Sequence, residues 1–156
     1  MQIPGFKVRS YKDIDKNKVF RLHSFALKKA NAFFKHGHWD EDFKNIEKIY
    51  VKNNGEFLVG FLNNKLIAMG ALKRISKNVA EIKRMRTHPK FQRKGFGQII
   101  LSRLEEKARK LGYKILQLDT TIKQTAAQKF YQKKGYKEVK RGFLGGFETI
   151  YYKKRL

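Results

Sequence analysis

The sequence predicts a single α/β domain over residues 1–156, built from about seven strands and four helices. Short apolar runs with strand-like alternation recur along the chain, and longer segments between them carry apolar residues at every third or fourth position. The 156 residues, of which 41% are apolar, suffice for one buried core. No internal repeat or linker divides the chain, so we expect one domain.

The first half of the chain predicts a strand, two helices and a hairpin. Residues 6–11 alternate in polarity and indicate a strand. Residues 13–34 have helical periodicity, from the apolar residues Val19, Leu22, Phe25, Ala26 and Phe33. Three acids at 40–42 suit the N-terminus of a second helix, which continues to about residue 50. Two apolar runs within residues 55–75 are joined by Asn63 and Asn64, which tolerate the positive φ of a hairpin turn.

A fourth strand begins near residue 79 and ends at Pro89. Ile82 and Met85 both resemble core residues, but they are three positions apart, whereas residues on one face of a strand are two or four apart. A β-bulge near Lys83 and Arg84 would restore the pattern and turn a backbone N–H aside. The alternative is a regular strand in which Arg84 is half-buried.

The second half alternates helices and strands. A long helix follows Gly97 and ends at Gly112, with one face formed by Ile100, Leu104, Ala108 and Leu111. Residues 113–119 predict a central strand, and residues 125–134 predict a helix that Gly135 ends. Two final strands, at 136–139 and 147–153, flank a loop at 140–146.

The charge is strongly positive, with 37 Lys and Arg against 13 Asp and Glu and a net charge of +24. Such a field attracts phosphates, nucleic acid or acidic surfaces, although a lysine-rich composition bias would produce the same balance. No cysteine is present, which excludes disulfides and thiolate chemistry. No apolar run is long enough to span a membrane and no secretion signal is evident, so we expect a cytoplasmic protein.

The stretch "QRKGFG", residues 92–97, lies between a predicted strand and a predicted helix. A helix N-terminus binds anions through its unpaired N–H groups, and Gly95 and Gly97 let a bulky phosphate approach the backbone. Arg93 and Lys94 add positive charge. The stretch fits neither the dinucleotide-binding nor the Walker pattern. It is therefore either a phosphate-binding turn or a tight turn at a helix start.

Two segments of the chain resemble segments of the GNAT family of N-acetyltransferases. "QRKGFG" is similar to that family's pyrophosphate-binding signature, and it follows a strand and a proline as it does there. A second block, "QTAAQKFYQKKGY" at 124–136, is similar to another family segment, with Gln124 where Asn is usual. The resemblance covers nearly the whole chain and implies a GNAT-like fold with a mixed, mostly antiparallel central sheet.

The resemblance also implies that acetyl-CoA is the co-substrate. We expect no metal, because His36 and His38 flank Gly37 but no third ligand is evident. The backbone of Met85, Arg86 and Thr87 would pair with the pantetheine arm as an added strand. The remaining residues that it implies contact acetyl-CoA are Gln92, Arg93, Lys94, Gly95, Phe96, Gly97, Gln98, Gln124, Ala127 and Tyr131.

Two residues are candidates for proton transfer. Tyr131 matches the family's usual general acid and would protonate the leaving thiolate. The alternative is a packed aromatic beside Phe130. Glu81 should lie on the opposite face of its strand from Ile82, toward the cleft, and would take the proton of the amine through water. The alternative is a salt bridge to one of the many cations.

The acceptor is expected to be a primary amine. An acceptor that carries a carboxylate or phosphate, or that is presented on a ribosome or nucleic acid, fits the charge better than a polycation does. The rival interpretation is a basic nucleic-acid- or ribosome-binding module with a vestigial acetyltransferase site. We expect a monomer or homodimer without membrane contact.

Overall fold

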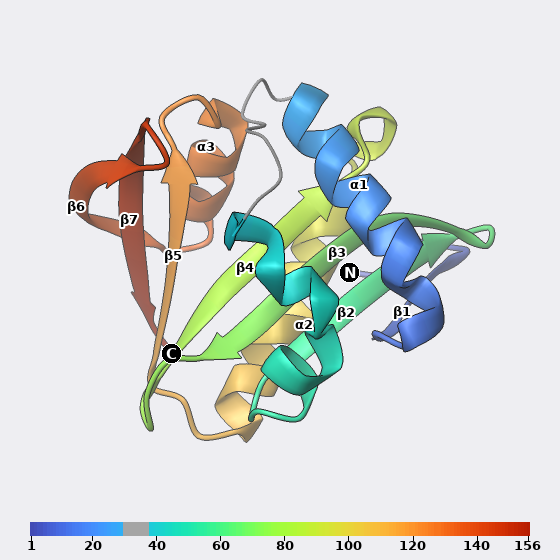
Figure 1. Cartoon of the computed structure of the whole chain (residues 1–156), viewed down its shortest axis with the longest axis horizontal. Coiled ribbons are helices and arrows are strands. Elements are labelled where there is room, and N and C mark those ends of the chain that lie inside the picture. The colour runs from blue at the N-terminus through green and yellow to red at the C-terminus, as the bar shows by residue number, and fades with distance from the viewer. Residues whose placement is uncertain (30–37) are drawn as a thin grey trace.

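The computed structural model describes residues 1–29 and 38–156 and confirms an α/β fold built on one seven-stranded sheet (Figure 1). The strands are β1 (Phe6–Ser10), β2 (Glu56–Leu62), β3 (Lys65–Arg74), β4 (Val79–Thr87), β5 (Ile115–Thr121), β6 (Lys137–Leu144) and β7 (Phe147–Arg155). Their order across the sheet is β1-β2-β3-β4-β5-β7-β6. All neighbouring pairs are antiparallel except β4 and β5, which are parallel. The predicted mixed, mostly antiparallel sheet is therefore confirmed.

Helices cover both faces of the sheet. The α-helices are α1 (Lys16–Lys29), α2 (Phe96–Lys110) and α3 (Thr125–Lys133), and two shorter helical segments are η2 (His38–Lys44) and η3 (Glu47–Val51). Figure 1 shows α1 in front of the sheet and α2 behind it. On the front face, α1, η2 and η3 bury residues such as Val19, Phe43 and Tyr50 against β2 and β3. On the other face, α2 and α3 pack onto the sheet in the larger core.

The helical predictions for the first half need correction. Residues 13–15 form a 3-10 turn before α1, and Phe25, one of the apolar residues with helical spacing, is 40% exposed. Phe33 and the predicted end of this helix lie outside the described residues. The second helix is replaced by η2, a 3-10 helix, and η3, a π-helical turn. Asp40 and Asp42 of η2 bind His23 and Arg84, so tertiary ion pairs as well as the helix dipole determine this segment.

Two strand boundaries were also wrong. The strand predicted at 113–119 runs from Ile115 to Thr121, so Asp119 lies within β5. The predicted loop at 140–146 is mostly strand, because β6 continues to Leu144 and only Gly145 and Gly146 form the turn into β7, both with positive φ. The last strand begins at Phe147, as predicted.

The parallel strands β4 and β5 separate after a short contact. They pair only over Val79–Glu81 and Ile115–Gln117, although β4 continues to Thr87 and β5 to Thr121. Beyond Glu81, β4 remains paired with β3 but not with β5. One edge of β4 is therefore left without a strand partner along its second half.

The predicted bulge in β4 is confirmed. Met69 of β3 pairs with Arg86 and Ala71 pairs with Lys83, so Arg84 and Met85 together lie opposite Gly70. Arg84 has a φ of 57°, which is uncommon for a residue other than glycine. A Cβ at position 70 would overlap the Met85 sulfur, so glycine is required where the bulge folds across β3. The Arg84 side chain is also mostly buried. The structure therefore has both the bulge and the buried Arg84, which the sequence analysis treated as alternatives.

Candidate active site

Two pockets meet at the point where β4 and β5 separate. The first, which we call the strand-gap pocket, lies between β4 and β5 and is lined by Ile82–Arg86 and Leu118–Thr121, together with His23, Asp40, Gln124, Ala127, Tyr131, Leu144 and Thr149. The second, the loop pocket, lies between the glycine turn and α3. Both pockets are lined by the same five residues, Met85, Arg86, Gln124, Ala127 and Tyr131, so they form two arms of one site.

The loop pocket is built on the N-terminus of α2. Arg93 and Gly95 have φ angles of 61° and 94°, which turn successive backbone N–H groups in one direction before the helix begins at Phe96. A Cβ at Gly97 would lie 3.3 Å from the Thr87 hydroxyl oxygen, so the helix start packs closely on the end of β4. Among the described residues that line this pocket, none is acidic and Arg86 and Arg93 are cationic. The pocket therefore favours an anion.

The structure brings together nearly all the residues that were expected to contact acetyl-CoA. All of them line the loop pocket except Lys94 and Phe96. Phe96 is 4% exposed and packs edge-on against the Phe6 ring, so only its backbone could reach a ligand. The ammonium nitrogen of Lys94 lies 5.9 Å from the centre of the Phe91 ring, at the rim of the turn. The binding roles of these residues remain predictions.

Gln124 occupies the position where the family resemblance leads one to expect asparagine. Its side-chain oxygen accepts hydrogen bonds from the Thr121 backbone N–H at 3.0 Å and the Thr121 hydroxyl at 3.3 Å. Gln128 in turn donates to the carbonyl oxygens of Thr121 and Ile122. These bonds hold the start of α3 against the end of β5, so Gln124 shapes the wall that both pockets share.

Tyr131 lies where the two pockets meet. It is 6% exposed, and its ring contacts those of Phe130 and Tyr136 edge-on, with ring centres 5.2 and 5.6 Å apart. Burial raises the pKa of Tyr131, which the positive charge of Arg86 opposes and the negative charge of Asp119 reinforces. The phenol is therefore protonated at neutral pH and can donate a proton. Tyr131 both packs in the core and lines the site, so the two sequence interpretations are compatible.

Glu81 does not line either pocket. Its carboxylate accepts a hydrogen bond from the Gln117 side chain at 3.1 Å and lies 3.8 Å from the Lys83 ammonium nitrogen. The structure thus shows the salt-bridge alternative, although it does not test whether Glu81 also takes a proton. Its role as the base remains a prediction.

Asp119 is one of two described carboxylates that line the strand-gap pocket, and unlike Asp40 it forms no ion pair with another described residue. Its side chain is exposed to solvent there, while protein surrounds the carboxyl on its other sides. That burial raises the pKa of Asp119, and the negative charge of Glu81 raises it further against the opposing effect of nearby cations. Sequence reasoning did not select Asp119. The signal was present, because Leu118 and Thr120 are buried and strand alternation places Asp119 on the opposite face.

A cluster of charged residues around Arg84 holds the bulge in place at the wall of the strand-gap pocket. Arg84 donates two hydrogen bonds to Asp42, from Nε at 2.9 Å and from Nη2 at 2.6 Å, and its guanidinium stacks on the Phe43 ring. The Tyr50 hydroxyl also donates to Asp42. Asp40 lies 3.6 Å from Arg84 and 2.9 Å from His23. The acids predicted as helix-start residues thus fix the segment that carries the bulge.

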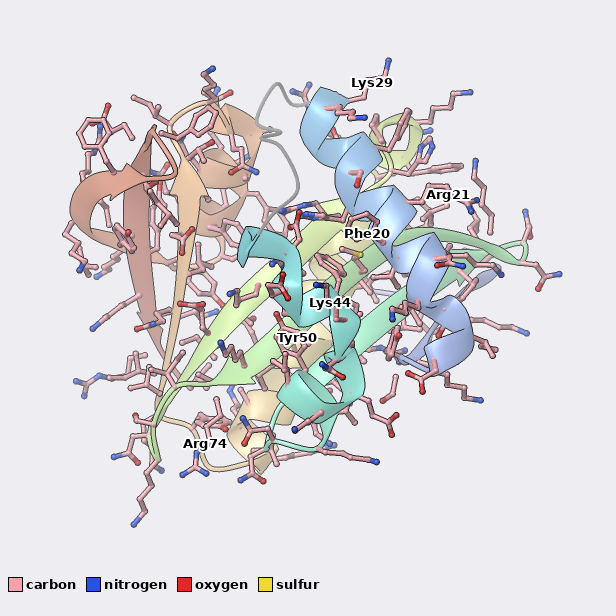
Figure 2. The ribbon with its side chains drawn as sticks, in the orientation of Figure 1. Phe20, Arg21, Lys29, Lys44, Tyr50 and Arg74 are labelled. Carbon is pink, nitrogen blue, oxygen red and sulfur yellow. The ribbon has the colours of Figure 1, made fainter. Side chains whose placement is uncertain are left out.

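The remaining positive charge is spread over the surface. Figure 2 shows nitrogen-tipped side chains on many elements, and the labelled Arg21, Lys29 and Arg74 extend outward from α1 and from the end of β3. Within the described part of the chain, no helix is both long and apolar enough to cross a membrane.

The fold and the site together define an enzyme that transfers an acyl group. Residues 19–136 match the model of the Acetyltransferase (GNAT) family. Because this match covers well over half of the chain, the chain belongs to the GNAT family of acetyltransferases. The predicted family, fold and enzyme class are therefore confirmed.

Solved structures share the fold at low sequence identity. An acetyltransferase from Streptococcus agalactiae is 22% identical, with a TM-score of 0.90 over 99% of this chain and 100% of that one. A GNAT family acetyltransferase from Elizabethkingia anophelis with acetyl-CoA bound is 18% identical, with a TM-score of 0.65 over 99% and 100% of the two chains.

One curated relative is more similar in sequence over a shorter region. The N-acetylaspartate synthetase of Xenopus tropicalis is 31% identical over 100 residues, which cover 63% of this chain and 37% of that protein. This chain therefore spans little more than a third of the relative that it matches.

Proposed function

We propose that this protein transfers the acetyl group of acetyl-CoA to a primary amine, with the donor in the loop pocket and the acceptor in the strand-gap pocket. One observation carries the proposal: the two pockets join at Tyr131 and Arg86, so a donor entering from one side meets an acceptor entering from the other. The complex of the Elizabethkingia enzyme with acetyl-CoA supports the choice of donor.

The residues that would hold the donor follow from the loop pocket. The N–H groups from Arg93 to Gln98 would receive the pyrophosphate, because a helix N-terminus with nearby cations favours phosphate oxygens. The unpaired edge of β4 beyond Glu81 would receive the amide groups of the pantetheine arm as a strand would. When bound, acetyl-CoA supplies an activated thioester whose carbonyl carbon accepts the amine nitrogen.

The transfer forms a C–N bond, breaks a C–S bond and moves two protons. One proton leaves the amine for a carboxylate of the protein, and the other passes from the Tyr131 hydroxyl to the departing sulfur. A backbone N–H at the bulge, from Met85 or a neighbour, would donate to the thioester oxygen as it gains negative charge.

We propose Asp119 as the first candidate for the carboxylate. It lines the strand-gap pocket, and its raised pKa moves it toward the range in which a carboxylate is an effective base. Glu81 is the second candidate, acting through water. If Asp119 is the base, Glu81 is a positioning residue whose negative charge keeps the pKa of Asp119 high.

The proposal is tested by calorimetry with acetyl-CoA, followed by an assay of CoA release with a panel of amines. Since the Xenopus relative is named for N-acetylaspartate, aspartate belongs among the first acceptors tested. Saturable binding of acetyl-CoA and acetylation of at least one amine are expected. A folded protein that does not bind acetyl-CoA would contradict the proposal.

The net charge of +24 favours a second candidate, a module that binds nucleic acid or a ribosome. The positive charge is distributed over nearly all elements, so such binding would be largely electrostatic. It is compatible with acetyltransferase activity at the site described above.

A further inference from the structure

Arg86 is a partly buried cation without an anionic partner among the described residues. Its Nη1 donates to the neighbouring Met85 carbonyl oxygen at 2.7 Å, and its Nε is enclosed with no hydrogen-bond partner. Among the described residues, no carboxylate lies within ion-pair distance of this guanidinium, in contrast to Arg84 two positions away, which Asp42 binds. A buried charge in this state is costly unless something else completes its surroundings.

The free edge of this guanidinium has a definite shape. One N–H of Nη1 is used, which leaves the second N–H of Nη1, both N–H groups of Nη2 and the enclosed Nε–H without partners among the described residues. Two parallel donors match the two oxygens of a carboxylate in the bidentate arrangement that arginine favours. Arg86 lines both pockets, so an anion bound there would lie beside Tyr131.

The other charges in the strand-gap pocket limit what kind of anion fits. Lys83 is near Glu81, Arg84 is held by Asp42, and Asp40 is shared between His23 and Arg84. Among the described residues that line this pocket, Arg86 is the cation and Asp119 the anion that form no ion pair with another described residue. A ligand with one carboxylate and one amine would complement both, whereas a polycation would face Arg86 and a polyanion would face Asp119.

We propose that Arg86 binds a carboxylate of the acceptor, so that the preferred acceptors are amines that carry a carboxylate, such as amino acids. This inference rests on the proposed acetyl transfer and specifies its substrate class. The acceptor's carboxylate accepts hydrogen bonds from the N–H groups of Arg86 that have no partner in the protein, and its amine lies toward Asp119.

Burial and the adjacent positive charge of Arg84 lower the pKa of Arg86 to about 10, so the guanidinium is still charged at neutral pH. Two other uses of that charge compete with carboxylate binding. Arg86 could contact the donor, or it could act on Tyr131, whose pKa it lowers. Each of these alternatives predicts a different pattern of loss in a variant.

The test compares acceptors that differ only in the carboxylate. The probes are the L-α-amino acids and β-alanine, each paired with its primary carboxamide, and O-phosphoethanolamine. CoA release gives kcat/KM, which is corrected for the fraction of neutral amine in each probe. For the wild-type protein we expect the best amino acid to exceed its carboxamide by about 10- to 100-fold, since charge-assisted hydrogen bonds are lost with the carboxylate.

In the Arg86→Gln variant we expect that preference to fall to about one, because kcat/KM for amino acids falls toward the value for their carboxamides. Lys83→Gln is the matched control, because it removes a positive charge from the same strand and pocket and should keep the preference. Loss of the preference in Lys83→Gln instead of Arg86→Gln would overturn the assignment. A wild-type protein that acetylates no carboxylate-bearing amine, or that prefers O-phosphoethanolamine to every amino acid, would also overturn it.

Binding of acetyl-CoA, measured by calorimetry on the same variants, separates the alternatives. Arg86→Gln should leave it within about twofold of wild type, and a large loss would show that Arg86 serves the donor. An equal fall in kcat for amino acids and carboxamides, with the preference intact, would show that Arg86 acts on Tyr131. If the wild-type protein itself does not bind acetyl-CoA, the proposed function fails, whereas acetylation without preference rejects only the carboxylate site.

Stability provides a readout that is independent of turnover. If Arg86 is an unsatisfied cation in the unliganded protein, Arg86→Met should raise the melting temperature by about 2–4 °C, because an uncompensated buried charge is replaced by an apolar chain of similar length. A guanidinium that supports the fold would show the reverse. A lower melting temperature in Arg86→Met would therefore contradict the inference.

Discussion

Replacing Asp42 with asparagine should destabilise the protein and distort the bulge. Asp42 holds Arg84 through two hydrogen bonds, at 2.6 and 2.9 Å, and the two side chains are only 12% and 11% exposed. Breaking a buried ion pair by removing one partner costs about 3–5 kcal/mol. We expect the lower end, about 3 kcal/mol, because Asp40 remains 3.6 Å from Arg84.

That loss corresponds to a fall of about 6–12 °C in the melting temperature of a domain of this size. Arg84 also has a positive φ, a conformation that persists only while its surroundings enforce it. The variant should therefore lose kcat through displacement of the bulge N–H, while acetyl-CoA affinity changes less. Scanning calorimetry and the CoA-release assay measure the two effects separately.

Glu41→Gln is the matched control for this prediction. It also removes one carboxylate from η2, but Glu41 pairs with Lys44 at 3.1 Å on the surface, where the side chains are 57% and 68% exposed. Exposed pairs contribute about 0–1 kcal/mol, so the melting temperature should change by less than about 4 °C. Equal melting temperatures for Asp42→Asn and Glu41→Gln would refute the reasoning.

The effect of Asp42→Asn should also depend on pH. Burial alone would raise the pKa of Asp42, but the hydrogen bonds and charge of Arg84 lower it overall. A carboxylate with a lowered folded-state pKa contributes its full stabilisation above its unfolded pKa, about 3.9, and loses it as the pH falls further. The difference between wild type and variant should therefore be constant from neutral pH to about pH 5 and shrink below about pH 4.

Four further expectations concern the site and the charge. Tyr131→Phe should lower kcat by about 10²- to 10⁴-fold with acetyl-CoA affinity retained; wild-type kcat would show that the phenol only packs. Gly97→Glu should abolish acetyl-CoA binding, because its Cβ would press on the Thr87 hydroxyl oxygen and its carboxylate would repel the phosphates, and unchanged affinity in the folded variant would place the donor elsewhere. If Asp119 is the base, Glu81→Gln should shift the acidic limb of the kcat/KM profile to lower pH, because the negative charge that raises the pKa of Asp119 is removed. A several-fold loss of kcat/KM concentrated at low pH would instead identify Glu81 itself as the base. Any RNA bound through the +24 charge should dissociate steeply with salt, and purified protein without affinity for RNA at about 0.1 M salt would exclude that partner.

The sequence predicted those features that depend on local pattern. Asn63 and Asn64 at the hairpin, Gly112 and Gly135 after two helices, and the bulge near Arg84 all follow from backbone preferences or from the two-residue period of a strand. The glycine turn was recognisable because its six residues form a local motif, and four of them, Gln92, Arg93, Gly95 and Gly97, line the loop pocket.

The features that were missed depend on contacts between distant segments. Asp42 and Arg84 are 42 positions apart, and no local pattern indicates that they pair. The partner of Glu81 was missed for the same reason. Strand alternation placed Glu81 on the opposite face from Ile82, but the residue that binds it, Gln117, comes from another strand. Arg86 was expected to contribute only backbone, because the absence of a counter-ion around a side chain is visible only in three dimensions.

The early separation of β4 and β5 has a consequence for dynamics. A strand edge that lacks a neighbour leaves its amide hydrogens open to exchange with solvent, so the amides facing the gap between Ile82 and Thr87 should exchange faster than those of β3. If the pantetheine arm pairs with that edge, acetyl-CoA should slow exchange there and at the facing end of β5 more than elsewhere. The chain would then leave its sheet incomplete, and each catalytic cycle would complete it with the donor and open it again when CoA leaves.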